Sequence, residues 1–354
     1  MELTVGVHRD PVLPLELADG WSALLARQAG ASVAQGPAYA AAALAAARPE
    51  GAQLALITAH HADGHLAGIW PLWTERDGDL RIARHIGGGS RQEYAGPLAE
   101  SAEAVAAMLQ VAKAEADALH LCNLPVGSPL LRLVRGLNTH RHAVNSPVTR
   151  CATAGTFDAW LAGRSKSFRQ SIRAGRRRLA DCGVLRMGRP RSEEFDRFVD
   201  WLFDAKCAWL GANHHHSDWL YVPGARAFAK AALRDPATGV VGHGIWIGDR
   251  QIAGSLSLVG PVCEYFVTTF DPAFARFSPG HILTAEVIAE AIGLGLDVDF
   301  RITNETYKER WIDDFDPRVT LTIATSWRAM PLLAREHLKS ARRKAAQVRR
   351  QLRP

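Results

Sequence analysis

The feature that most constrains the fold of this 354-residue chain is an internal repeat. Residues 54–73 and 243–260 each read as a strand, a turn containing Asp and Gly, and a second strand that begins with an apolar-Ala-Gly segment. Each of these hairpins is followed along the chain by a helix and then by an apolar strand, so the same unit occurs twice. This pattern predicts an α+β domain that is duplicated in tandem.

The elements after the two hairpins match in order. In the first half a helix over about 101–118, with Ser101 as its cap, leads to an apolar strand at 120–124. In the second half a helix from about 280 to 293 leads to a strand at 296–300. The chain is also long enough for two domains, since single hydrophobic cores stop growing at roughly 250–300 residues.

Periodicity breaks near residues 145–165, and this break divides the chain. We expect an N-terminal domain over 1–150, a second domain over 151–327, and a basic helical tail over 328–354. The net charge of +6 is unevenly spread, because residues 164–191 hold ten Lys or Arg and one acid, and residues 335–354 hold eight and one. The remainder is acidic, so a partner that carries phosphates or other anions is expected at these two basic elements.

Several classes of protein and site are disfavoured. The chain has no apolar run near the roughly 18 residues of a membrane span, and its first residues lack the pattern of a signal peptide, so a cytoplasmic location is expected. Five scattered cysteines without metal-site spacing predict reduced, mostly buried thiols. We interpret His214–His216 as a solvated loop rather than a metal site, and Gly87–Gly89 as a turn rather than a dinucleotide loop.

Four segments of the second half carry a family resemblance through their order and spacing. They are the basic helix Ser167–Val184, the hairpin segment Gln251–Gly254, the pair Phe270–Pro272 and Ser278–Gly280, and Asp299–Phe300 with Glu305-x-Tyr307-Lys308-x-x-Trp311. In these segments, from about residue 150 to 325, the chain resembles the FemAB/CelD-like branch of the GNAT acyltransferases, which is associated with cellulose and exopolysaccharide biosynthesis. The first half resembles this branch more weakly, through its hairpin and residues 94–98. The resemblance implies tandem GNAT-like domains with mixed central sheets.

The resemblance also implies where an acyl donor binds. In the GNAT fold two central parallel strands splay apart, the pantetheine of the donor pairs with the exposed strand edge, and N–H groups at the next helix start hold its pyrophosphate. The residues expected to bind the donor are Arg276, Ser278, Gly280 and His281. Arg276 supplies charge and Gly280 allows close backbone approach. The loop has one glycine and a proline where the family pattern is Q/R-x-x-G-x-G/A, so acetyl-CoA, a longer acyl-CoA, an acyl carrier protein and an aminoacyl-tRNA all stay open as donors.

Acyl transfer to an amine needs a group that removes a proton and a group that stabilises the oxyanion. The candidates for catalysis are Asp299, Tyr307 and Lys308. Lys308 resembles the lysine of the FemAB Lys-x-x-Phe-Gly element, although Trp311-Ile312 replaces Phe-Gly. The resemblance implies that Lys308 binds the carbonyl oxygen or an acceptor phosphate, and that Tyr307 reprotonates the leaving thiolate. A surface loop in which Lys308 pairs with Glu305 is the structural alternative.

The acceptor is expected at basic and polar side chains of both halves. These are Arg169, Arg173, Glu305 and Tyr94. In the implied fold the basic helix flanks the cleft between the domains, so we expect a small-molecule or lipid-linked anionic acceptor and no metal. The tail can lie on the anionic surface of the inner membrane or stay exposed to solvent.

The sequence therefore favours an acyltransferase that moves an acetyl or other acyl group from acyl-CoA to an amine or hydroxyl. The expected acceptor is a sugar or a lipid-linked precursor in envelope, exopolysaccharide or cellulose synthesis. A FemAB-type transferase that uses aminoacyl-tRNA is an alternative, and it is the one case in which a nucleic acid takes part. The other alternative is a non-catalytic scaffold that binds a nucleotide or a membrane.

Overall fold

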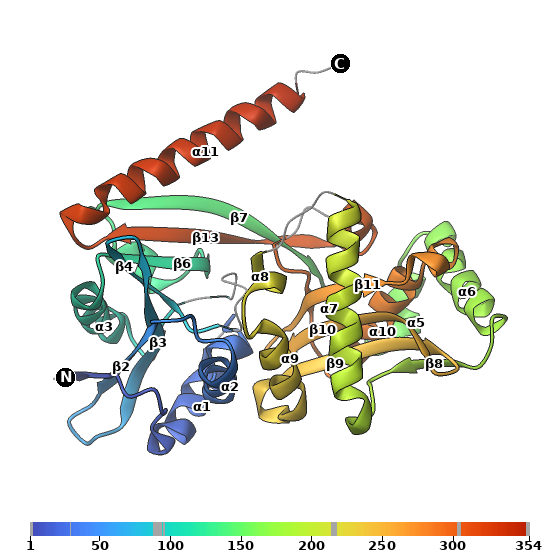
Figure 1. Cartoon of the computed structure of the whole chain (residues 1–354), viewed down its shortest axis with the longest axis horizontal. Coiled ribbons are helices and arrows are strands. Elements are labelled where there is room, and N and C mark those ends of the chain that lie inside the picture. The colour runs from blue at the N-terminus through green and yellow to red at the C-terminus, as the bar shows by residue number, and fades with distance from the viewer. Residues whose placement is uncertain are drawn as a thin grey trace.

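The structure, a computed structural model, describes residues 3–28, 30–87, 94, 96–213, 218–302 and 306–351. One mixed sheet runs through both halves of the described chain (Figure 1). Its strand order is β1-β2-β3-β4-β6-β13-β7-β12-β11-β10-β9-β8, and β5 pairs with β3.

The first half contributes strands β1 to β7 and the helices that cover them. The strands are β1 (Thr4–His8), β2 (Gln53–His60), β3 (Leu66–Asp77), β4 (Leu80–His85), β5 (Leu98–Ala99), β6 (Ala118–Pro125) and β7 (Thr139–Thr149). The helices are η1 (Leu15–Leu17), α1 (Ala18–Arg27), η2 (Val33–Gln35), α2 (Pro37–Ala46), α3 (Ala102–Glu115) and α4 (Pro129–Leu133).

The second half contributes the other strands and helices. The strands are β8 (Leu185–Gly188), β9 (Val240–Ile247), β10 (Arg250–Val259), β11 (Cys263–Phe270), β12 (Val298–Asp299) and β13 (Asp314–Ala324). The α-helices are α5 (Phe157–Ala162), α6 (Lys166–Ala180), α7 (Phe195–Ala212), α8 (Asp218–Tyr221), α9 (Ala225–Arg234), α10 (Pro279–Gly293) and α11 (Met330–Gln351). The 3-10 helices are η3 (Ser192–Glu194), η4 (Pro236–Thr238), η5 (Pro272–Phe277), η6 (Thr306–Arg310) and η7 (Trp327–Ala329).

The duplicated unit predicted from the sequence is confirmed. Strands β2 and β3 form one antiparallel hairpin, and strands β9 and β10 form the other. The predicted turns fall at Gly64 and Gly248, which both adopt the positive φ that favours glycine. The hydroxyl of Ser101 accepts a hydrogen bond from the Ala104 N–H and caps α3, and β6 follows this helix as expected.

The last strand of the chain returns to the first half. Strand β13 pairs antiparallel with β6 on one side and with β7 on the other. Strand β7 in turn pairs with β12, so it crosses from one half of the sheet to the other. The division into two domains at residue 150 stays a prediction. The sheet is continuous there, because β7, which ends at Thr149, pairs with both β13 and β12.

Helices of the two halves also share a hydrophobic core. Tyr39 of α2 packs edge-to-face on Phe228 of α9, with ring centroids 5.0 Å apart. At Gly224, before α9, an added Cβ would lie 1.9 Å from the Ala46 carbonyl oxygen. Only glycine therefore lets the two backbones approach this closely, and the two halves are held together by tight packing.

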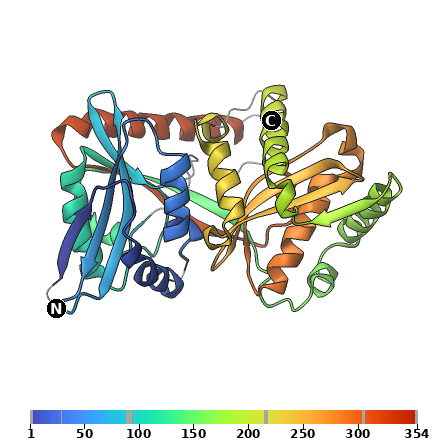
Figure 2. The same cartoon turned by 60° about the horizontal axis from the view of Figure 1, so that its bottom comes forward.

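The basic helix α6 has the buried stripe that the sequence predicts. Ser165 caps it by accepting from the Phe168 N–H, and Phe168, Ile172 and Leu179 are buried. It packs on α10 and η5 at the end of the molecule remote from β2 and β3, as Figures 1 and 2 both show. The expectation that α6 flanks the cleft between the halves is therefore wrong, because its apolar stripe is buried against the outer face of α10.

The tail forms the predicted helix α11, which contacts β7 and β13. Its first turns are anchored by buried Leu332 and Leu333, whereas Leu338 is exposed. In the part of the chain that the structure describes, each helix is too short or too polar to cross a membrane. All five cysteines are free thiols, but only Cys151 and Cys263 are buried, so the expectation that most of them are buried is wrong.

Candidate active site

Two parallel strands in the middle of the sheet separate after a short contact. Strands β11 and β12 are paired only through Cys263 with Val298 and Glu264 with Asp299. Past Asp299 the chain turns away from β11. Arg301 adopts a φ of 56°, which is uncommon for a residue other than glycine. Strand β11 continues to Phe270 and pairs there with β10 alone among the described strands. Among the described residues, the edge of β11 over 265–270 on the side of β12 therefore has no strand partner, and we refer to it as the open edge.

A long helix begins beside this open edge. Residues of η5 lead into α10, and Ser278 between them adopts the left-handed conformation with a φ of 56°. The four residues predicted to bind the donor all lie at or just before this helix start: Arg276, Ser278, Gly280 and His281. Arg276 is exposed, and its guanidinium lies over the Phe277 ring. A helix N-terminus with a nearby arginine is an arrangement that binds anions.

Gly280 has a packing role that the sequence does not reveal. A Cβ at this position would lie 3.3 Å from the ring of Phe270, the last residue of β11. A larger side chain would therefore push the helix start away from the strand end. A substitution at Gly280 therefore disturbs the packing of the helix start against the end of β11.

His281 lies in the first turn of α10 with its ring oriented by a tryptophan. The Trp311 Nε1–H donates to His281 Nδ1 at 3.0 Å. This bond requires an unprotonated Nδ1, so the proton of the neutral ring is on Nε2. Burial lowers the pKa of His281, and the charge of Arg310 lowers it further. His281 is therefore a neutral N–H donor at the start of the helix.

Lys308 lies at the point where the two strands separate. Its side chain is buried, and its Nζ is 3.5 Å from the Phe300 carbonyl oxygen. The ammonium also lies over the rings of Tyr265 and Phe300, at 5.9 and 5.8 Å from their centroids. Tyr265 is the first residue of β11 beyond the paired segment, and Phe300 directly follows β12. A cation is thereby fixed beside the open strand edge on the face that α10 covers.

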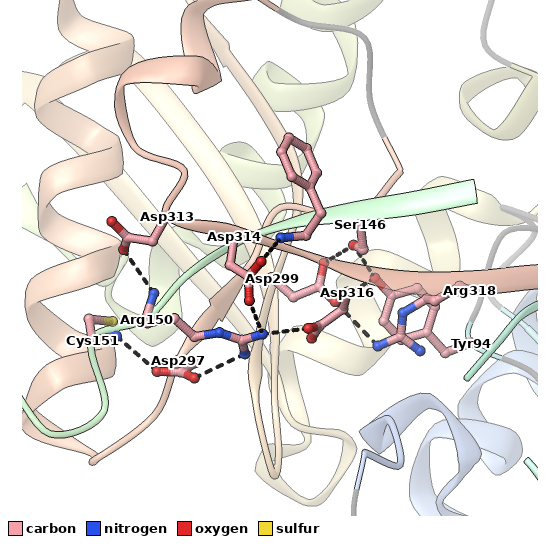
Figure 3. Close-up of polar contacts among 11 residues, drawn as sticks. Tyr94, Ser146, Arg150, Cys151, Asp297, Asp299, Asp313, Asp314, Asp316 and Arg318 are labelled. Carbon is pink, nitrogen blue, oxygen red and sulfur yellow. Dashed lines mark hydrogen bonds and ion pairs between the residues drawn. The ribbon is translucent and has the colours of Figure 1, made fainter. Parts of the chain in front are cut away.

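Asp299 faces the side of the sheet opposite to Lys308. Lys308 lies over the ring of Phe300, and the neighbouring residues Asp299 and Phe300 point to opposite faces of the sheet. Its carboxylate accepts hydrogen bonds from the Tyr94 hydroxyl at 2.6 Å, from the Ser146 hydroxyl and from the Arg301 N–H at 2.6 Å. Arg318 lies 3.4 Å away and also contacts the ring of Tyr94 (Figure 3). The structure therefore brings Tyr94 and Asp299 together, on the other side of β12 from Lys308.

Glu264 is a second buried acid on this face, and the sequence analysis missed it. It lies opposite Asp299 on β11, and Arg301 Nη1 is 3.6 Å from its carboxylate. Burial raises the pKa of Glu264 to about 7, and Asp299 adds to this effect while Arg301 opposes it. A carboxyl group that titrates near neutrality is suited to accept a proton. The signal in the sequence is the single charged residue of strand 263–270.

An exposed arginine ties the ends of the central strands together. Arg150 follows β7 and contacts Asp297, Asp314 and Asp316 (Figure 3). Burial opposes the charge of Arg150, but hydrogen bonds to Asp316 and Asp314 raise its pKa above the ordinary value. Arg150 is thus a permanent cation that joins β7, β12 and β13 at the place where the halves meet.

The other predicted site residues are not gathered here. Arg169 and Arg173 lie on α6, and Arg169 donates to the carbonyl oxygens of Ala162 and Arg164. Glu305 and the side chain of Tyr307 lie outside the described residues, as do His214–His216 and Gly88–Gly89. Among the described residues no group of His, Cys, Asp and Glu could hold a metal ion.

Comparisons with known proteins agree with this geometry. Residues 166–309 match the family model described as acetyltransferase (GNAT) domain. Among solved structures, the chain is similar to FemX, with a TM-score of 0.65 and 12% identity over 94% of this chain and 100% of that chain. A search of the curated proteins finds no match.

Two further structures share the fold. One is the C-terminal domain of a putative lysylphosphatidylglycerol synthetase from Agrobacterium fabrum, with a TM-score of 0.57 and 12% identity over 90% of this chain and 95% of that chain. The other is L-PGS from Bacillus licheniformis, with a TM-score of 0.50 and 10% identity over 89% and 95%. The chain thus contains a GNAT acetyltransferase domain at residues 166–309, and this domain makes it an acyltransferase.

Proposed function

We propose that this acyltransferase moves an acyl group from acyl-CoA, with acetyl-CoA as the first donor to test, to an amine or hydroxyl. The observation that carries this proposal is the open edge of β11 with the buried Lys308 at its start and the start of α10 beside it. An extended pantetheine chain can pair with residues 265–270. Its pyrophosphate would then lie against Ser278 to His281, with Arg276 as a counter-charge.

Residues on both faces of the sheet, near the end of β12, supply the chemistry in this proposal. Lys308 donates a hydrogen bond to the oxygen of the thioester carbonyl when the acceptor nitrogen or oxygen attacks its carbon. Glu264, when ionised, accepts the proton that the acceptor loses. Tyr307 returns a proton to the sulfur as the carbon–sulfur bond breaks. Asp299 positions Tyr94 and Arg318 at the edge of this site rather than acting on the donor.

For the acceptor we propose an anionic sugar or lipid-linked precursor of envelope or exopolysaccharide synthesis, as the FemAB/CelD-like resemblance implies. The fold likeness to a protein named as a putative lysylphosphatidylglycerol synthetase supports a lipid-linked acceptor. The basic tail would place the enzyme at the inner membrane from the cytoplasmic side. Deletion of residues 340–354 should then reduce retention on anionic vesicles at low salt and keep the melting temperature, because the buried Leu332 and Leu333 remain.

A second candidate is transfer from an aminoacyl-tRNA, and two observations favour it. The similarity to FemX covers nearly the whole chain. In addition, α10 begins with Pro279, which has no N–H to offer a pyrophosphate. Glu305, Arg169 and Arg173 stay candidates for contacts with either acceptor or tRNA.

Calorimetric titration separates these candidates. Acetyl-CoA should bind the wild-type protein with a dissociation constant below 1 mM, on the order of values typical for enzyme substrates. If binding of acetyl-CoA is absent at this concentration while charged tRNA raises the melting temperature, the aminoacyl-tRNA candidate replaces the first. If neither binds, a longer acyl-CoA or an acyl carrier protein remains as the donor to test.

A further inference from the structure

A thiol and an imidazole meet on the first half of the sheet, away from the point where β11 and β12 separate. The Cys122 Sγ lies 3.6 Å from His120 Nε2, and His120 Nδ1 lies 2.9 Å from the Thr322 hydroxyl oxygen. Cys122 and His120 are two residues apart on β6, so both side chains project from the same face. Thr322 lies directly opposite His120 on β13.

We propose that Cys122 is an activated thiol and a site of covalent modification by small electrophiles, among them hydroperoxides. The thiolate, not the thiol, is the nucleophile, and a neighbouring imidazole promotes its formation. When His120 Nδ1–H donates to Thr322, the lone pair of Nε2 is directed at the sulfur and can take its proton. In the other tautomer Nε2–H donates to the sulfur and stabilises the thiolate directly.

A carboxylate on α11 supports the charged form of this pair. Burial opposes ionisation of Glu336, but the hydrogen bond from Lys339 and nearby charges, including His120, lower its pKa overall. Glu336 is therefore ionised at neutral pH and attracts the proton of the imidazolium. The thiolate, the imidazolium and the carboxylate alternate in charge, which is the favourable order.

The other cysteines have different surroundings. Cys151 and Cys263 are buried, and burial raises the pKa of each to about 12, so both remain protonated thiols. Cys182 is exposed after α6, and its Sγ lies 3.3 Å from the Arg178 carbonyl oxygen. Cys182 therefore serves as an accessible reference thiol within the same protein, whereas Cys122 is only half-buried.

The reaction with hydrogen peroxide balances as follows. The Cys122 thiolate sulfur attacks one peroxide oxygen, a sulfur–oxygen bond forms, and the oxygen–oxygen bond breaks. The leaving hydroxide takes the proton that His120 holds, and water departs. The sulfur is oxidised to a sulfenic acid and the peroxide is reduced, so no other reactant is needed.

The test is alkylation by iodoacetamide at pH 7, with Cys122 and Cys182 quantified separately by peptide mass spectrometry. We expect the rate at Cys122, expressed relative to Cys182, to fall about tenfold in His120→Asn, because an ordinary thiol has only a few per cent thiolate at this pH. Thr322→Val should lower the ratio several-fold, and Thr322→Ser, which keeps the hydroxyl, should leave it unchanged. After treatment with hydrogen peroxide, a sulfenic-acid probe should label Cys122. The extent of labelling should rank the variants in the same order as the alkylation rate does.

Two results would overturn the proposal. One is a Cys122 to Cys182 ratio that stays constant in His120→Asn and Thr322→Val while both variants keep the wild-type melting temperature. The other is a ratio that falls in Thr322→Ser, because this variant keeps the hydroxyl and so distinguishes its loss from a loss of packing.

Discussion

The side chains proposed to take part in the reaction lie on both faces of the sheet near the end of β12. Lys308 lies on the face that α10 covers, beside Tyr265 and Phe300. Asp299 and Glu264 lie on the face toward the first half. In this proposal a donor held along the edge of β11 has Lys308 on one side of the sheet and Glu264 on the other.

Replacement of Lys308 tests the proposed oxyanion donor. Lys308→Met should lower kcat about a hundredfold with little change in KM for acetyl-CoA, since a bond made mainly in the transition state is lost. Lys308→Arg, which keeps the charge, should retain more of the activity. Release of free CoA with glucosamine 6-phosphate, an anionic amino sugar, as the acceptor measures both. A folded Lys308→Met variant with wild-type kcat would place the oxyanion contact elsewhere.

Glu264 gives the protein a specific dependence on pH. Its pKa is near 4.5 in the unfolded chain and about 7 in the folded protein, so the folded state binds more protons between these values. The free energy of unfolding should therefore fall as pH rises from 4.5 to 7. Glu264→Gln, which stays neutral, should lose this part of the pH dependence in urea unfolding and be relatively more stable at pH 8. An unchanged pH slope would show that Glu264 is not buried in this environment.

The residues that sequence analysis could and could not find differ in a physical way. Lys308 and Asp299 stand in segments with family resemblance, so they were candidates from the start. Glu264 and Arg318 belong to no motif, and each acquires its role only because strands far apart in the chain bury the two charges near Asp299. An isolated charge in a strand indicates such a role but does not identify its partner.

Secondary-structure elements were predictable where their signals are local. The hairpins, α3 with its Ser101 cap, and α10 from Pro279 to Gly293 follow from periodicity and turn residues. Strand β12 is only two residues long, whereas the apolar run predicts five, because its length is limited by where β11 and β12 separate. The placement of β13 between β6 and β7 depends on pairings across nearly 200 residues, which no local pattern encodes.

The start of α10 can be tested as an element that binds the donor. Arg276→Ala should raise KM for acetyl-CoA several-fold with kcat nearly unchanged, because a phosphate contact is equally strong in the ground and transition states. Arg132→Ala is the matched control, since Arg132 is an exposed arginine on α4 of the first half and has no role in the proposed site. Equal KM values in wild type and Arg276→Ala would contradict a pyrophosphate site at this loop.

At the scale of the whole molecule, the two halves are joined by buried polar contacts as well as by a shared core. Tyr94 and Ser146 come from the first half, and Asp299 and Arg318 from the second, yet all four meet in one network (Figure 3). The Asn123 carbonyl oxygen accepts from Arg318 Nη1 and extends this network to β6. The continuous sheet therefore has a buried network with an ion pair between Asp299 and Arg318 at its centre.

Loss of the Arg318 cation from this network should lower the free energy of unfolding strongly. Arg318→Met leaves the buried Asp299 without its ion pair and should reduce the free energy of unfolding by about 3–5 kcal/mol. Tyr94→Phe, which removes the hydrogen bonds of the Tyr94 hydroxyl with Asp299 and Ser146, should cost about 1–2 kcal/mol. Addition of Asp299→Asn to Arg318→Met should restore part of the loss. Urea unfolding of the four proteins measures these differences, and a stable Arg318→Met variant would mean that Asp299 is solvated or protonated.

Hydrogen exchange of the backbone amides, with and without saturating acetyl-CoA, locates the donor directly. If the donor lies in the opening between β11 and β12, peptides that cover residues 265–270 and 279–284 should exchange more slowly when it is bound. Peptides of the β2–β3 hairpin in the first half serve as the control and should be unchanged. Saturable binding of acetyl-CoA that protects other segments and leaves residues 265–270 unaffected would contradict a donor site at this strand edge.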